Sequence, residues 1–267
     1  MIRHPAVSGQ FYSGNPTTLR NELDRFIKTG LEREKVIGII APHAGYMYSG
    51  AVAGSVYSII EIPDTVIILG PNHHGYGAKM ALYPAGEWIT PLRTTKVNEK
   101  LSQLIKGNSS RIEEDSGAHR YEHSLEVQLP FLQNINPDLS VVPICLGSCS
   151  FEECMELGTG IAKAIREFEK DVLMVASSDM THYESASAAK KKDQLALNEV
   201  LALNPEGLLK TCRNEAISMC GVIPATVMLV AALELGARKA TLVNYATSGD
   251  VTGDNEQVVA YAALTIR

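Results

Sequence analysis

The sequence lacks the marks of a membrane or secreted protein. Its apolar stretches, such as Val66–Gly70 and Val222–Leu235, are too short or too interrupted to cross a bilayer. The first residues, Met1–Pro5, contain no apolar segment of the secretory type. We therefore expect a cytoplasmic protein that has no membrane partner.

Cysteine is present, but not in the patterns that disulfide-rich or zinc-binding proteins use. The chain has five cysteines and no CxxC motif. An odd count without a secretory signal argues against a disulfide framework, and the missing motif argues against a structural zinc site. We expect four of the cysteines to be buried structural side chains, namely Cys145, Cys149, Cys154 and Cys212.

Positive charge is also scarce. The 24 Lys and Arg residues are outnumbered by 30 Asp and Glu residues, which gives a net charge of −6. The only local basic run, Lys190–Lys192, is followed at once by Asp193, as on a solvated helix face. We therefore expect no nucleic-acid partner.

What the sequence does contain is an alternation of strand and helix patterns without a repeat or a linker. We expect one domain over residues 1–267. Short, nearly continuous apolar segments rich in β-branched residues predict strands that are buried on both faces of a sheet. These segments are Val36–Pro42, Thr65–Pro71, Leu139–Leu146, Val172–Ser178, Ala240–Ala246 and Val258–Ile266.

Helical patterns lie between these strands. Asn15-Pro16-Thr17 predicts the start of a helix that ends at Gly30. Further helices are predicted over Ser49–Ile60, Val97–Lys106, Ser124–Leu132, Phe151–Lys170, Ser185–Leu201, Pro205–Thr211 and Pro224–Leu235. The alternation predicts an α/β fold with a mixed, largely parallel central sheet and helices on both faces. Ligands of such sheets bind just beyond the carboxyl ends of the strands.

Histidines gather at the predicted strand ends. His43 follows the first strand, His73 and His74 follow the second, and His182 follows the strand that ends at Ser178. If these strands are parallel neighbours, the imidazoles converge on one edge, where imidazole can serve as metal ligand or general base. A single histidine after a strand is usually a turn residue bonded to backbone, but three separate strand ends favour a site.

The segment 122–130 supports two interpretations. Helical spacing would place Glu122 and Glu126 on one face, with His123 next to them. In the first interpretation, Ser124 or Glu122 caps a helix whose leucines face the core. In the second, His123 and a glutamate reach the pocket, as acid–base groups or as groups that orient a ligand imidazole.

Cys220 also allows two interpretations. It lies beside Gly221 and near the start of a predicted helix, where backbone N–H groups can lower the pKa of a thiol. A buried structural cysteine is the commoner case, and the local sequence alone favours it.

Ordered motifs extend over almost the whole chain, namely Arg3–Tyr12, Ala41–Tyr46, Leu69–His74, Glu122–Glu126, Ser177–His182, Cys220-Gly221, Asn244–Gly249 and Ala260–Ala263. Together they resemble the Memo family. The resemblance implies a fold similar to that of class III extradiol ring-cleaving dioxygenases, which hold non-haem Fe(II) with two histidines and a carboxylate.

The resemblance further implies a metal pocket built from two histidines and a cysteine. Carried over by motif, His43 and His73 would be the histidine ligands and Cys220 the thiolate ligand. A thiolate in place of a carboxylate softens the site and favours Cu(I), Zn or Fe over Mg or Ca. Ring cleavage therefore does not follow from the resemblance.

Proton-handling groups are implied beside the metal. Asp179 and His182 would line the pocket and His123 would complete it, so these three are the candidate catalytic residues. The leading hypothesis is a metal-dependent, oxygenase-like redox enzyme that acts on an unknown small molecule. Fe(II) is the first choice of ion, and copper or zinc are the alternatives.

Two other functions stay open. One is a zinc-dependent hydrolase in which His182 acts as the base. The other is an adaptor-like module that binds a peptide or protein in the same cleft without turnover, as some Memo relatives are described. Memo-family members in microbes also go with radical-SAM and AMMECR-type proteins, which implies pathway partners but no particular reaction.

Overall fold

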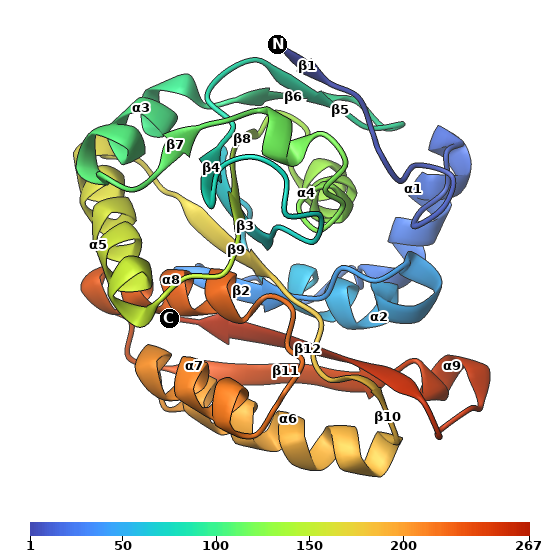
Figure 1. The fold of residues 1–267 in the computed structure, drawn as a ribbon. Helices are drawn as coiled ribbons and strands as arrows, with labels where there is room; N and C mark the ends of the chain where they lie inside the picture. Colours follow the sequence, from blue (N-terminus) through green and yellow to red (C-terminus); the bar gives the residue numbers. More distant parts are fainter.

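One mixed β-sheet runs through the computed structural model, which describes residues 1–267 (Figure 1). Its strands are β1 (Ile2–Arg3), β2 (Gly38–Ala41), β3 (Thr65–Pro71), β4 (Met80–Leu82), β5 (Glu87–Ile89), β6 (Thr94–Val97), β7 (Glu113–Glu114), β8 (Ser140–Leu146), β9 (Leu173–Ser177), β10 (His182–Glu184), β11 (Ala240–Thr247) and β12 (Val258–Ile266). The strands follow the order β1-β5-β6-β8-β3-β9-β2-β12-β10, with β11 paired to β12 and β4 paired to β7 and β8.

The centre of this sheet is parallel. Strands β8, β3, β9 and β2 pair in parallel, and β12 joins β2 in the antiparallel direction. Every residue of β2, β3 and β9 is buried, as expected for continuous apolar strands covered on both faces. The predicted α/β fold with a largely parallel sheet is confirmed, and each predicted strand is present.

The remaining strands are those that sequence patterns did not indicate. Strands β1, β4, β5, β6, β7 and β10 have two to four residues each. An alternating pattern cannot be recognised over so few positions, and these strands exist because neighbouring strands pair with them.

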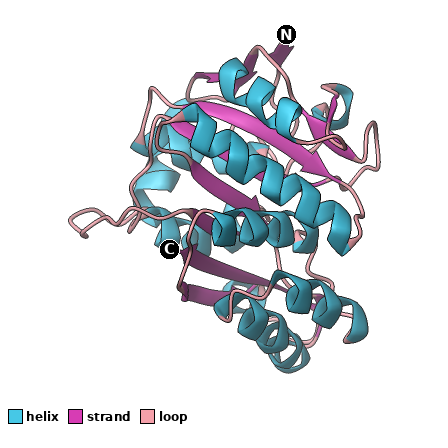
Figure 2. Cartoon of the chain, turned by 90° about the vertical axis from the view of Figure 1, so that its left-hand side faces the viewer, coloured by secondary structure: helices cyan, strands magenta, loops and turns pink.

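The helices cover both faces of the sheet. They are α1 (Pro16–Phe26), α2 (Tyr46–Tyr57), α3 (Glu99–Asn108), α4 (Leu129–Ile135), α5 (Phe151–Phe168), α6 (Ala186–Leu201), α7 (Pro205–Asn214), α8 (Val222–Glu234) and α9 (Gly249–Thr252). One core cluster packs α3, α5, α6, α7 and α8 on one face, and a second packs α1, α2 and α4 on the other. Figure 2 shows a layer of helices in front of the strands. None of these helices combines the length and apolar character needed to cross a membrane.

One predicted helix begins later than its sequence pattern indicates. The pattern predicts a helix over Ser124–Leu132, but α4 starts at Leu129, after a 3-10 turn over Glu126–Gln128. The Ser124 hydroxyl caps no helix and instead donates to the Pro71 carbonyl oxygen at 3.1 Å. The segment therefore packs along the end of β3 in a non-helical conformation.

Gly70 permits this close approach. A Cβ atom at Gly70 would lie 2.6 Å from both Leu125 Cδ1 and Ser124 Oγ. A side chain at position 70 would have to displace the side chains of Ser124 and Leu125, which directly follow His123.

A buried ion pair fixes the N-terminal segment to the same region. Arg3 Nη1 lies 2.8 Å from Glu126 Oε2, and both side chains are almost fully buried. Glu126 also accepts hydrogen bonds from the Val7 N–H and the Tyr12 hydroxyl. The expectation that Glu122 and Glu126 share one helical face is wrong, because the 3-10 turn directs Glu126 to Arg3 and away from the histidines.

Candidate metal centre

Three parallel strands end at one edge of the sheet and bring the predicted site residues there. Strands β3, β9 and β2 are parallel neighbours. His73 follows β3, Asp179 follows β9 and His43 follows β2, each within two residues of the strand end. Ligands of such sheets bind at this edge, beyond the carboxyl ends of the parallel strands.

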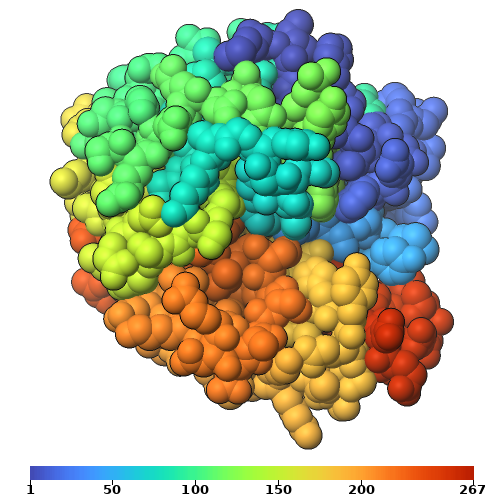
Figure 3. Space-filling view, viewed as in Figure 1, coloured from blue at the N-terminus to red at the C-terminus, as the bar shows by residue number.

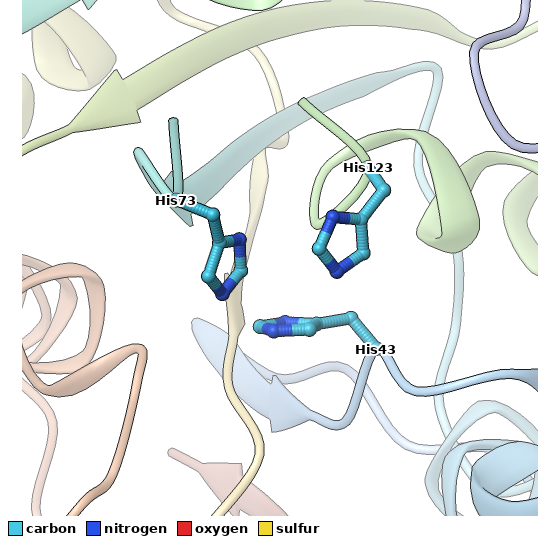
Figure 4. A group of neighbouring side chains, drawn as sticks. All are labelled: His43, His73 and His123. Atoms are coloured by element: carbon cyan, nitrogen blue, oxygen red, sulfur yellow. The ribbon is translucent and has the colours of Figure 1, made fainter. Parts of the chain in front are cut away.

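His43, His73 and His123 form the most compact group at this edge. Each contributes one ligand nitrogen, and these nitrogens all lie within 4.8 Å of one another. The rings of His73 and His123 stack with centroids 4.6 Å apart, and His43 lies edge-on at 5.1 Å and 5.4 Å. Figure 4 shows His73 and His123 side by side, with a nitrogen of each directed toward His43. The group could hold a metal ion.

Hydrogen bonds fix the tautomer of His43. Its Nδ1 lies 2.9 Å from Ser177 Oγ, and the Ser177 hydroxyl donates to the Ser124 carbonyl oxygen at 2.7 Å. Gln128 Nε2 also donates to Ser177 Oγ, at 2.8 Å. Because the single Ser177 proton is already used, His43 Nδ1 must be the donor, which leaves the Nε2 lone pair free for a ligand bond.

Glu122 fixes the ring of His73. Glu122 Oε1 lies 2.9 Å from His73 Nδ1, and Oε2 accepts a 2.7 Å hydrogen bond from the His73 backbone N–H. The same Oε1 lies 3.5 Å from His123 Nδ1. A carboxylate on Nδ1 leaves Nε2 as the free nitrogen, an arrangement typical of metal-binding histidines.

Cys220 lies at the edge of the three-histidine group. Its Sγ is 3.2 Å from His43 Nε2, and the Asp179 backbone N–H donates to the sulfur at 3.3 Å. A Cβ atom at Gly221 would lie 2.3 Å from the Ser177 carbonyl oxygen, so only glycine lets this loop approach the end of β9. The structure therefore brings Cys220 to His43 but not into the three-histidine group.

Burial controls the charge of the site in the absence of a metal. Burial lowers the pKa of His43 well below its usual value, and the nearby His123 and His73 lower it further. Burial likewise lowers the pKa of His123 to about 4. Burial and the nearby Asp179 raise the pKa of the Cys220 thiol. At neutral pH, His43 and His123 are thus neutral and the thiol is protonated.

The two carboxylates differ. Burial alone would raise the pKa of Glu122, but hydrogen bonding to His73 and the backbone N–H of Ser124 bring it below its usual value. Burial raises the pKa of Asp179 to about 6 although His43 donates its backbone N–H to the carboxylate at 2.8 Å. Glu122 is therefore an ionised partner for imidazole, whereas Asp179 titrates near neutral pH.

A cavity of about 610 Å³ opens above the histidines. Besides His43, His73 and His123, it is lined by Asp179 and His182. His182 Nδ1 lies 3.0 Å from the Ser218 carbonyl oxygen, which can only accept, so its Nε2 is the free nitrogen. On the space-filling surface, the segments around β10, α2 and the loop after β3 adjoin one another (Figure 3).

His74 and Cys220 lie outside the three-histidine group. His74 Nε2 bonds to the Tyr121 carbonyl oxygen at 3.0 Å, and its ring stacks on Tyr76. Cys220 lines a second cavity of about 390 Å³, which shares His73 with the first but contains none of the other histidines. The sequence could not separate His74 from His73, because both follow the same strand.

Several residues that contribute to the site could not be predicted from the sequence. Ser177 and Gln128 orient His43, and Phe11 packs its ring 4.7 Å from that of His123. A buried polar residue such as Gln128 can be recognised as part of the site only when the fold shows which groups it contacts. Phe11, Tyr48, Tyr183 and Tyr261 also line the cavity, and they come from four distant segments, so no local motif indicates them.

Comparison with known proteins settles the family. The sequence model of the Memo-like protein family matches residues 3–265. The chain belongs to the Memo family. A MEMO1 family protein of Methanosarcina barkeri is 42% identical over 99% of this chain and 100% of the relative. One of Methanosarcina mazei is 43% identical over 99% of each chain.

Other comparisons give a further Memo relative and one solved structure. A MEMO1 family protein of Pyrobaculum aerophilum is 38% identical over 98% of each chain. Among solved structures, an uncharacterized protein from Escherichia coli K12 aligns with a TM-score of 0.49 and 14% identity, over 85% of this chain and 99% of that chain. The likeness of the Memo fold to class III extradiol dioxygenases stays a prediction.

Proposed function

We propose that this Memo protein is a metal-dependent, oxygenase-like redox enzyme that acts on a small molecule bound above His43, His73 and His123. The observation that carries the proposal is the three-histidine group at the floor of a 610 Å³ cavity. Hydrogen bonds on the Nδ1 atoms of His43 and His73 leave their other nitrogens free, as metal binding requires.

The donor set suits a transition metal ion. Imidazole nitrogen favours iron, copper or zinc over magnesium and calcium, and a thiolate strengthens that preference. We assign His43 and His73 as the histidine ligands and Cys220 as the thiolate, because Cys220 Sγ lies 3.2 Å from the free His43 nitrogen. His123 is the neighbouring imidazole that completes the site. Fe(II) is the first choice of ion, with copper or zinc as alternatives.

A bound iron or copper ion would supply electron transfer and Lewis acidity. The chain's own groups position the ligand and move protons. The free Nε2 of His182 accepts a proton from a bound hydroxyl or amine, and Asp179 anchors the loop that carries His43 through the His43 backbone N–H. Glu122 holds the ring of His73 in its productive orientation.

Metal loading tests the proposal. Protein purified without a His tag and without added metal is analysed for its elements, then titrated anaerobically with Fe(II) and Cu(I). We expect tight binding that His43→Ala and His73→Ala each abolish, while His74→Ala leaves it intact. Zinc as the native ion would favour the hydrolase alternative, and failure to bind any ion would end the proposal.

Proton release separates Cys220 from His123 as a ligand. The thiol is protonated before binding because burial raises its pKa, so thiolate coordination releases about one proton. Calorimetric titration at pH 7 in buffers of different ionisation enthalpy measures this number. We expect the wild type to release about one proton more than Cys220→Ser. Equal release would remove the thiolate from the ligand set.

An adaptor that recognises phosphorylated peptides is less well supported. The residues that line the cavity include no lysine or arginine, whereas they include Asp179 and Asp254. Phosphate recognition ordinarily relies on arginine or lysine. This lining favours an uncharged or cationic ligand over an anionic peptide.

A further inference from the structure

We infer that the cavity above the histidines accepts a planar aromatic molecule with a cationic or hydrogen-bond-donating tail, and that it discriminates against anionic analogues. The inference rests on the proposed function, because it assigns a substrate class to the same site. Its basis is the composition of the cavity lining, which combines aromatic rings with a polar and acidic segment.

Aromatic rings form one part of the cavity lining. Phe11, Tyr48, Tyr183 and Tyr261 line the cavity together with the imidazole rings. Phe11 already packs against His123 with centroids 4.7 Å apart and a tilt of 48°. Aromatic rings favour offset or edge-to-face contact at such separations, so a flat ring fits this wall. The volume of about 610 Å³ is ordinary for a pocket that encloses a small molecule.

Tyr183 is held at this wall by a strained backbone. Its φ is +59°, a conformation that a bulky residue rarely adopts, and its side chain is 75% exposed. The flanking residues hold the strain in place: the His182 backbone N–H donates to Ser218 Oγ at 2.8 Å, and Lys192 pairs with Glu184 at 2.6 Å. Strain of this kind concentrates at ligand-binding positions, which supports a contact role for Tyr183.

Polar and acidic groups form another part of the cavity lining. Ser248, Thr252, Asp254 and Gln257 line it, and residues 248–257 contain three acidic residues and no lysine or arginine. The Glu256 backbone N–H donates to Asp254 Oδ1 at 2.9 Å, which fixes the carboxylate and leaves Oδ2 without a protein partner. A cationic tail would pair with this carboxylate, whereas an anionic tail would be repelled.

Three phenols that differ only in the tail test the inference. Tyramine has a cationic tail, 4-ethylphenol a neutral one and 4-hydroxyphenylacetate an anionic one. Their dissociation constants are measured by equilibrium dialysis at low ionic strength, with metal-free and with zinc-loaded protein. We expect tyramine to bind most tightly and 4-hydroxyphenylacetate most weakly, with roughly a tenfold difference between them.

Matched variants assign this preference to named residues. Asp254→Asn keeps the side-chain acceptor for Glu256 and should reduce the charge preference to about twofold. Glu256→Gln removes the same charge outside the cavity lining and should preserve most of the preference. Tyr183→Ala should weaken all three phenols by a similar factor, whereas Tyr76→Ala, an exposed tyrosine outside the cavity, should weaken none.

Several results would overturn the inference: no binding of any phenol, equal or tighter binding of 4-hydroxyphenylacetate, or equal effects of Asp254→Asn and Glu256→Gln. Failure here is distinguishable from failure of the proposed function, because metal affinity is measured separately. Charge preference in a protein that binds no metal would refute the redox proposal alone. Tight metal binding without charge preference would refute the ligand class alone.

Discussion

Glu122 and Glu126 are chemically identical, four residues apart and both fully buried, yet they have different partners. Glu126 pairs with Arg3 and accepts hydrogen bonds from the N-terminal segment and Tyr12. Glu122 contacts His73 and His123 beside the cavity. We call these the Arg3–Glu126 hub and the Glu122–imidazole hub.

The comparison shows that the role of a buried carboxylate depends on the groups with which it forms hydrogen bonds. When a carboxylate pairs with a guanidinium and also accepts hydrogen bonds from backbone N–H groups, its hydrogen-bonding capacity is used within the protein. Such a carboxylate holds the chain in place. A carboxylate on imidazole Nδ1 atoms leaves their Nε2 atoms exposed to a cavity. The first hub should therefore govern stability, and the second should govern metal affinity.

The largest expected effect belongs to Glu126. Glu126→Ala leaves the buried guanidinium of Arg3 unpaired and orphans the Tyr12 hydroxyl, so we expect the free energy of unfolding to fall by about 3–5 kcal/mol. Urea denaturation measures this loss. Glu32→Ala, at an exposed glutamate, is the control and should change stability by less than about 0.5 kcal/mol. A loss below about 1 kcal/mol for Glu126→Ala would contradict the assignment.

Glu122 should instead affect metal binding. Glu122→Gln keeps the side-chain shape but weakens the hold on His73 Nδ1, so metal affinity should fall by about 10–100-fold. Anaerobic titration of folded protein provides the measurement. Glu126→Gln makes the same chemical change in the other hub and should leave the affinity unchanged. Equal losses in both variants would erase the distinction between the hubs.

His119, which lies beside the Arg3–Glu126 hub, makes the stability of the fold depend on pH. Burial and the charge of Arg3 lower the pKa of His119 to about 3, whereas the unfolded value is about 6.5. Below pH 6.5 the unfolded chain binds the extra proton, so His119 lowers stability by about 1.4 kcal/mol per pH unit down to pH 3 and has no effect above pH 6.5.

The variant His119→Gln tests this contribution. The free energy of unfolding is measured between pH 7 and pH 5 for both proteins. The wild type should lose stability more steeply with falling pH than the variant, whatever the difference at pH 7. Parallel curves would show that His119 is protonated equally in the folded and unfolded chains.

The smallest effect is expected at His74. Its ring contacts the Tyr121 carbonyl oxygen and Tyr76, not the other histidines. His74→Ala should therefore change metal affinity by no more than about twofold, because loss of one exposed hydrogen bond is a small perturbation. A loss comparable with that of His73→Ala would show that the loop after β3 offers both rings to the metal.

Much of the sheet could be predicted, because buried parallel strands need continuous apolar segments such as Thr65–Pro71. The convergence of His43 and His73 followed from the same reasoning, since both residues leave strands that pair with β9 in parallel. The start of α4 at Leu129 could not be predicted, because tertiary contacts of Ser124 and Glu122 override local helical spacing.

The residues that support the site could not be predicted from the sequence either. Gln128 supports His43 through Ser177 on β9 and through the Pro42 carbonyl oxygen, to which Gln128 Nε2 donates at 2.9 Å. Whether His123 joins His43 and His73 depends on the non-helical path that Gly70 permits. Such contacts form only in the folded chain, so the spacing of residues along the sequence does not predict them.

The central claim is that the two ligand histidines and Cys220 hold one metal ion. X-ray absorption spectroscopy of the zinc-loaded protein tests it most directly, with Cys220→Ser as the control. We predict imidazole nitrogens at about 2.0–2.1 Å and one sulfur at about 2.3 Å, with the sulfur shell missing from the variant. A zinc site with only nitrogen and oxygen ligands in the wild type would contradict the claim.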